Sequence, residues 1–293
     1  MIETLEITIP LFRINIIGTS EYAFQEKKFV ITPFDPHNQI PSSDLFSIQD
    51  VSKIKTARWA LKIIDPGSED YEEDINLILM SIRILKNFSP FVRFFLCIKD
   101  ARHNYRLDTA MIPTKPENSD NTISIKEFYK VEDYYNSLLN LRSISTRTHN
   151  AVFFLYKAFH AIHWVDAYLF YMLAIEALFS KDEGGSAKKT FIDRTHCFLA
   201  KEIIPHDKDL LEKVYKLRSF IVHGKPISRS KPDQNIAELL QVENLAIAVF
   251  KKILDQKLAD RFKDSERDRF LNGAVASKKN NDRTNHRTLL LKE

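Results

Sequence analysis

The pattern of apolar and polar positions divides the chain into two parts of different character. In the first part, short runs alternate apolar and polar residues with a period of two, which indicates half-buried β-strands. Three such runs are predicted to be strands: LEITIPLFRINI at 5–16, KKFVITPF at 27–34 and ARWALKII at 57–64. The run FVRFFLCI at 91–98 is almost continuously apolar, and its length predicts a buried strand rather than a helix.

One helix is predicted among these strands, over residues 68–90. Its acidic first turn suits the positive end of the helix dipole, and Pro90 predicts where it stops. The apolar side chains recur at helical spacing and form one stripe, at Ile75, Leu79, Ile82 and Leu85. The first part of the chain is therefore expected to be mixed α and β.

Residues 108–122, DTAMIPTKPENSDNT, have the composition of a linker, and we place a domain boundary there. The sequence predicts an α+β protein with three parts. These are a mixed α+β N-terminal domain at 1–115, a C-terminal all-α helical bundle at 122–262 and a polar, flexible tail at 263–293. The N-terminal domain is expected to serve as a sensor or specificity domain.

Beyond the linker, the apolar positions follow the 3.6-residue period of amphipathic helices. Ser124 and Glu127 have the spacing of a capping box at the start of the first helix. A straight helix over 149–180 would be about 50 Å long, so a break is predicted near His160–His163. The five predicted helices lie at 124–141, 149–180, 189–202, 207–223 and 235–258.

Composition narrows the class of protein. A hydrophobic fraction of 44% and a charged fraction of 28% are those of a soluble globular chain. The longest apolar stretch, 151–179, contains too many charged and polar residues to span a bilayer, so no membrane partner is expected. Cys97 and Cys197 fit neither a disulfide framework nor a metal site, and no signal peptide is recognisable. The expected location is therefore the cytoplasm.

Candidate chemistry concentrates in VYKLRSFIVHGKP, at 214–226, which contains Arg218 and His223. On a regular helix, side chains five residues apart point about 140° away from each other, so the two converge only if the helix ends or distorts between them. Gly224 is predicted to take the left-handed cap position, and Pro226 forbids continuation. Spacing alone favours a capped helix end that places cations near free carbonyls over a catalytic pair.

Three segments together resemble the HEPN family, and most closely its ApeA-like branch. They are YMLAIEALFS at 171–180, KTFIDRTHCFLA at 189–200 and VYKLRSFIVHGKP, whose Arg218 and His223 match the family's Arg-x4–6-His motif. The resemblance covers about a third of the chain, from roughly residue 150 to 255. It implies a helical bundle that is typically dimeric and often a metal-independent endoribonuclease of toxin–antitoxin, phage-defence or RNA-processing systems.

The resemblance carries over Arg218 and His223 as the candidate catalytic pair, with no cofactor and no metal. It implies RNA as substrate, a homodimer formed through the bundle and an antitoxin protein as a further partner. Ser219 departs from the family pattern, because many active members have Asn, Asp or His after the motif Arg. The alternative is therefore a catalytically inactive HEPN module that binds a protein or RNA. A third hypothesis is that the protein is the partner of a nucleotidyltransferase.

Supporting roles are assigned to Glu176, Arg194 and Ser219. Glu176 lies within an apolar helix and is expensive to bury unpaired, so it is expected either to form a structural ion pair or to orient Arg194, Arg218 or His223. Arg194 matches an interior arginine of the family and is expected to be a buried bridging partner rather than an RNA contact. A metal at His160 and His163 is the weaker alternative, because no further ligand set accompanies them.

The implied mechanism needs two copies of the chain. RNA cleavage without a metal requires a base for the 2′-OH proton, an acid for the leaving 5′ oxygen and a cation for the phosphorane charge. Each chain offers one histidine, so a two-fold dimer would offer two histidines and two arginines in one cleft. His223 and its symmetry copy would share acid–base duty while Arg218 holds the phosphate. The expected products carry a 2′,3′-cyclic phosphate and a 5′-hydroxyl.

Overall fold

The computed structural model of the chain contains two compact units, residues 1–136 and 137–293. The described residues are 6–18, 20–24, 28–36, 51–52, 54–64, 71–86, 91–92, 96–97, 121–181, 186–199, 208–225 and 232–276. The linker predicted within 108–122 lies almost wholly outside them. The boundary between the two units, after residue 136, lies later in the chain than the predicted start of the bundle at 122. The reason is that Ile123, Phe128 and Val131 are buried in the core of the first unit.

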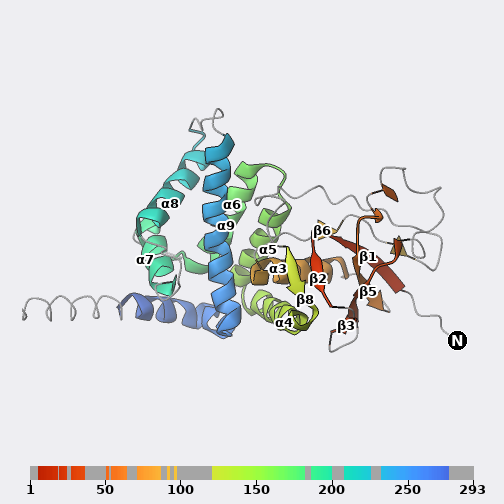
Figure 1. Cartoon of the computed structure of the whole chain (residues 1–293). Helices are drawn as coiled ribbons and strands as arrows, with labels where there is room; N and C mark the ends of the chain where they lie inside the picture. Colours follow the sequence, from red (N-terminus) through yellow and green to blue (C-terminus); the bar gives the residue numbers. More distant parts are fainter. Residues whose placement is uncertain are drawn as a thin grey trace, which may run out of the picture. The chain divides into compact units, whose positions relative to one another are not determined.

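The first unit is built on an antiparallel sheet (Figure 1). The strand order is β3-β4-β5-β1-β6, and β7 also pairs with β1. The strands predicted at 27–34 and 57–64 are confirmed as β4 and β5. Within the strand predicted at 91–98 the structure describes β6 and β7, and residues 93–95 between them lie outside the described residues. The bounds are β1 Glu6–Phe12, β3 Tyr22–Ala23, β4 Phe29–Pro33, β5 Trp59–Ile64, β6 Phe91–Val92 and β7 Leu96–Cys97.

The strand predicted over 5–16 is divided in two at Arg13. The backbone of Arg13 has φ 53°, an uncommon value for a residue with a side chain, and it turns the chain out of the sheet. The following strand, β2 Asn15–Ile17, pairs in parallel with β8 Thr122–Ser124. This pairing was missed because β8 is only three residues long and borders the polar linker. It ties the segment after the linker to the start of the chain.

The core of the first unit lies between the sheet and α3 Tyr71–Lys86, which confirms the predicted helix. Ile7, Ile9 and Leu11 of β1 alternate inward at the strand period and are at most 6% exposed. The helix contributes its predicted stripe, in which Ile75 and Ile82 are 2% and 0% exposed. Removing such side chains from water stabilises the unit by roughly 25 cal/mol per Å² of apolar surface.

The second unit is a helical bundle in which α6 is the central helix (Figure 1). Helix α6 packs against α5, α7, α8 and α9, and its fully buried side chains lie along one face, from Ala167 to Phe179. α4 begins in the first unit and ends in the second. The bounds are α4 Phe128–Ile144, α5 Thr146–His160, α6 Trp164–Phe179, α7 Ala187–Leu199, α8 Lys208–Val222 and α9 Pro232–Asp255.

Two predicted features of the helix boundaries are confirmed. The break near His160–His163 is present, because Ala161 has an extended backbone (ψ 138°) between α5 and α6. Ser124 and Glu127 form the predicted capping box, which starts a short 3₁₀ helix, η2 Ile125–Glu127, directly before α4. None of the described helices is both long enough and apolar enough to cross a membrane.

The C-terminal segment differs from the predicted flexible tail. Residues 264–276 are helical and follow η3 Ala259–Phe262, whereas 277–293 lie outside the described residues. Leu271 is 0% exposed, and the ring of Phe270 lies 6.0 Å from that of Phe262 and 6.4 Å from that of Phe198. The prediction failed because these few apolar residues are surrounded by charged ones, which hid a helix with one buried face.

Candidate functional site

Helix α8 ends at Val222 and is closed by a Schellman motif that follows the two motif residues. Gly224 has φ 63°, as predicted for the left-handed cap. Its N–H donates to the carbonyl of Ile221 at 3.1 Å, and the N–H of Lys225 donates to the carbonyl of Phe220 at 2.9 Å. His223 is therefore the C-cap residue of α8, and its side chain is exposed. Pro226 lies outside the described residues.

The helix stays regular between Arg218 and His223. The N–H of His223 still donates to the carbonyl of Ser219 at 3.1 Å, the bond expected in an uninterrupted α-helix. The two side chains consequently leave α8 about 140° apart. The helical hydrogen-bond pattern continues through His223, so the backbone of one protomer does not turn the guanidinium and the imidazole toward each other.

Arg218 forms an ion pair with Glu176 of α6. Its Nη2 donates a hydrogen bond to Oε2 of Glu176 at 2.8 Å, and the two side chains are 23% and 14% exposed. The guanidinium carbon also lies 5.9 Å from the centre of the Tyr215 ring, within cation–π range. Arg218 Nε and Glu176 Oε1 are buried and bond to none of the described residues. Glu176 thus forms an ion pair with Arg218, which fits both the structural ion pair and the orienting role that the sequence left open.

Burial dominates the ionisation of Glu176. Loss of water raises the pKa of Glu176 above its ordinary value of 4.5, and the nearby charge and hydrogen bond of Arg218 offset this only in part. The ion pair with Arg218 therefore offsets only part of the cost of removing the Glu176 carboxylate from water.

Replacing Glu176 with glutamine should change how stability depends on pH. Because the pKa of Glu176 is raised, the folded state binds more protons than the unfolded state between the ordinary and the raised pKa. The free energy of unfolding of the wild type is therefore lowered as pH rises through this window. The glutamine variant lacks that loss, so its stability relative to wild type, measured by urea denaturation, should increase as pH rises above the ordinary pKa of 4.5. A constant difference would contradict this.

Arg194 belongs to a separate cluster and contacts neither Arg218 nor His223 in any described interaction. Its side chain is 2% exposed, and Nη1 lies 3.2 Å from the backbone oxygen of Phe179 and 3.0 Å from Oδ1 of Asp268. Nη2 donates to Asn272 at 3.1 Å. These contacts confirm that Arg194 is a buried bridging partner. They also connect α6 and α7 to the helical segment 264–276.

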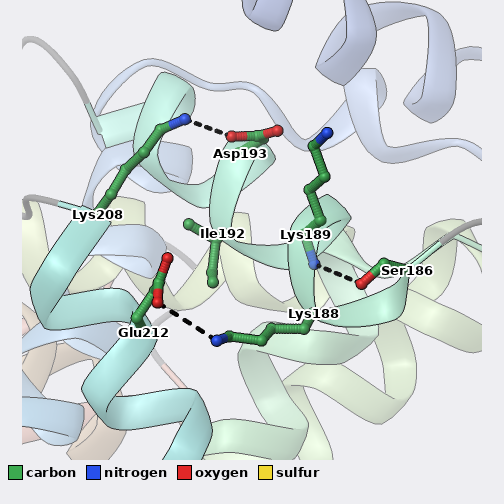
Figure 2. A pocket seen from close by; sticks show the side chains of 7 residues that line it. All are labelled: Ser186, Lys188, Lys189, Ile192, Asp193, Lys208 and Glu212. Atoms are coloured by element: carbon green, nitrogen blue, oxygen red, sulfur yellow. Dashed lines mark hydrogen bonds and ion pairs between the residues drawn. The ribbon is translucent and has the colours of Figure 1, made fainter.

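Helices α7 and α8 border an open pocket of about 320 Å³ that is lined largely by charged side chains (Figure 2). Lys188 of α7 pairs with Glu212 of α8 at 3.4 Å, and Lys208 of α8 pairs with Asp193 of α7 at 2.5 Å. Each helix thus supplies one lysine and one carboxylate to the other. These reciprocal pairs balance most of the charge in the pocket and hold α8 against α7.

A larger hollow of about 470 Å³ lies between α8 and α9. We call it the α8–α9 groove; α8 lines it with Lys213, Lys216 and Phe220, and α9 with Gln234, Glu238 and Gln241. The apolar stripes of the two helices, on which the sequence prediction was based, do not indicate this groove. The available signal was the spacing of basic, aromatic and amide residues at i, i+3 or i+4 and i+7 on two successive helices.

No described residues form a group of three or more His, Cys, Asp or Glu placed to bind a metal ion. In the alternative His160–His163 site, Nδ1 of His160 lies 2.9 Å from the backbone oxygen of Tyr156, and its ring packs on the Tyr156 ring.

Comparisons of the chain with protein-family models, with curated proteins and with solved structures find no match.

Proposed function

We propose that the protein is a metal-independent endoribonuclease of HEPN type, acting in a defence or toxin–antitoxin setting. The observation that carries the proposal is His223, an exposed imidazole at the capped end of α8, with Arg218 held in a fixed direction one turn earlier by Glu176. An accessible imidazole and an oriented guanidinium are the groups that this chemistry requires.

A second copy of the chain would complete the site. Because Arg218 and His223 of one protomer point about 140° apart, the phosphate would lie between groups from different protomers. Arg218 uses Nη2 for Glu176, and its Nη1 bonds to none of the described residues and so is available to a phosphate oxygen. Val222, one turn after Arg218 on the same face of α8, is 52% exposed and is suited to contact the second copy.

In the proposed reaction, the imidazole of one His223 accepts the proton of the substrate 2′-OH. The 2′ oxygen attacks the adjacent phosphorus, the bond to the 5′ oxygen breaks, and the imidazolium of the partner's His223 gives this oxygen its proton. Arg218 stabilises the charge that develops on the non-bridging oxygens. One product ends in a 2′,3′-cyclic phosphate and the other begins with a 5′-hydroxyl, so no water and no metal enter this step.

The reaction class can be tested with full-length protein, total RNA and EDTA. Cleavage should persist in EDTA and leave 2′,3′-cyclic phosphate ends, which polynucleotide kinase removes before ligation or labelling. The same RNA sequence carrying 2′-O-methyl groups should remain intact, because it lacks the nucleophile. Cleavage of the methylated RNA, dependence on added divalent metal or no cleavage at all would contradict the proposal.

The second candidate function is a catalytically inactive HEPN-like module that binds RNA or protein. The separation of Arg218 and His223 on one chain, and the engagement of Arg218 with Glu176, favour it. Ser219 at the position after the motif arginine points in the same direction. In that case the protein would bind RNA without cutting it, and the assay in EDTA separates the two candidates.

A further inference from the structure

The α8–α9 groove combines a rigid apolar floor with an aromatic ring bordered by cations. Tyr168 and Val214 of the floor are 1% and 3% exposed, and the Tyr168 hydroxyl donates to the backbone oxygen of Val214 at 2.8 Å. Phe220 is half-buried, and the ammonium groups of Lys216 and Lys225 lie 5.6 and 4.7 Å from the centre of its ring. Aromatic rings beside lysines bind stacked bases and their phosphates.

The α9 side of the groove carries hydrogen-bonding groups on one helix face. Gln234, Glu238 and Gln241 are spaced i, i+4 and i+7, and Nε2 of Gln234 donates to Glu238 at 3.1 Å. A glutamine amide has both donors and an acceptor, and a carboxylate accepts from exocyclic amino groups. This set matches the polar edge of an unpaired nucleobase, which single-strand-specific proteins recognise in the same way.

The same face of α8 leads directly to His223. Lys213, Lys216, Phe220 and His223 are spaced i, i+3, i+7 and i+10 on a helix that is regular through Val222, so they form one stripe within about 60° of its middle. Phe220 and His223 are three residues apart, which places their Cβ atoms about 5–6 Å from each other. A base stacked on Phe220 would therefore have its phosphate beside the imidazole.

The net positive charge around the groove favours an anionic ligand. Lys213, Lys216 and Lys225 border it, whereas Glu238 is its lining carboxylate. Three cations against one anion suit a phosphate-bearing ligand and disfavour a basic peptide. The volume of about 470 Å³ also exceeds what one amino-acid side chain fills and accommodates one nucleoside.

We propose that the α8–α9 groove binds one nucleotide of a single-stranded RNA and reads its base. Phe220 stacks on the base, the three polar residues of α9 contact its edge, and the bordering lysines hold the neighbouring phosphates. This inference rests on the proposed function for the identity of the ligand as RNA. The groove would select which base lies next to the phosphate that His223 cleaves.

The test measures binding of fluorescent 2′-O-methyl oligonucleotides of A, C or U, each about twelve nucleotides long, to the full-length protein by anisotropy. These probes are not cut, so binding is separated from cleavage. Phe220→Leu, which keeps apolar bulk but removes the ring, should weaken binding about tenfold. Gln241→Ala should change the order of preference among the three probes. Lys216→Ala should weaken all three equally and reduce the dependence of binding on salt.

Phe153 of α5 provides a matched control. It is 44% exposed, and the ammonium group of Lys157 lies 5.2 Å from the centre of its ring, as Lys216 does near Phe220. Phe153→Leu should leave binding unchanged. Thermal unfolding of each variant identifies any effect that comes from misfolding; if Phe220→Leu is unstable, Gln241→Ala at an exposed position carries the test.

Each outcome has one meaning. Binding that is unchanged by Phe220→Leu and by Gln241→Ala overturns the groove proposal, even if the protein cleaves RNA. Loss of a dimer by Phe220→Leu in sedimentation, with normal RNA affinity, also overturns it and makes the groove a protein interface. Groove-dependent binding without any cleavage supports the groove and removes only the ribonuclease. Binding of no probe overturns the groove proposal whether or not cleavage occurs.

Discussion

Replacing His223 with alanine should lower the rate of RNA cleavage in EDTA by about a thousandfold or more. In a two-fold site this one substitution removes both the acid and the base, and each such group contributes about 10²–10⁴ to the rate. Arg218→Ala should lower the rate by about 10²–10³, as expected for loss of a group that stabilises transition-state charge. Rates are measured as initial cleavage of a labelled RNA.

His149 supplies the control for this loss. It is an exposed histidine in α5 of the same unit, and Ser145 begins that helix with a capping box directly after α4. His149→Ala should cleave RNA at the wild-type rate. If His149→Ala and His223→Ala behave alike, whether both remain active or both lose activity, then His223 has no specific catalytic role.

Ending the chain at residue 263 should lower the free energy of unfolding of the helical unit by about 3–5 kcal/mol, because an arginine that is 2% exposed loses its charge partner. Asp268 is itself 39% exposed, so solvent screens part of that ion pair. Loss of the buried Leu271 and of the Phe270 contacts adds to the effect. The midpoint of thermal unfolding should fall by roughly 10 °C.

A chain ending at residue 276 is the matched control and should unfold like the full-length protein.

The loss of stability in the chain that ends at residue 263 should also depend on pH. Burial would raise the pKa of Asp268, but Arg194 and Arg267 outweigh it and hold the pKa below its ordinary value of 3.8. The stabilisation is therefore present above about pH 4 and is lost as pH falls through the lowered pKa. Equal stability of both truncated chains would contradict the docked helix.

The parts of the fold that follow from local pattern were predictable. The alternation in β4 and β5, the stripe of α3 and the break between α5 and α6 all arise from interactions within a few residues. The parallel pairing of β2 with β8 depends instead on segments 107 residues apart, for which a short run contains no signal. The docked helix at 264–276 depends on Arg194, whose partners in that helix, Asp268 and Asn272, lie more than seventy residues later.

The candidate site shows the same limit. Gly224 as a left-handed cap follows from local backbone chemistry, and the structure confirms it. The partner of Glu176 could not be chosen from sequence, because three cations were equally available and only the packing of α6 against α8 selects Arg218. The α8–α9 groove likewise exists only because two amphipathic helices lie side by side. Helical spacing alone does not say which faces meet.

The most direct test of the central claim is a mixed dimer of wild-type and His223→Ala chains, purified after co-expression with two different tags. A site that needs the imidazoles of both copies keeps only one of them in such a dimer. Its cleavage rate should therefore lie at least about a hundredfold below that of the wild-type dimer. A mixed dimer that keeps about half of the wild-type rate, or a wild-type protein that cleaves RNA as a monomer, would contradict a site built from two copies.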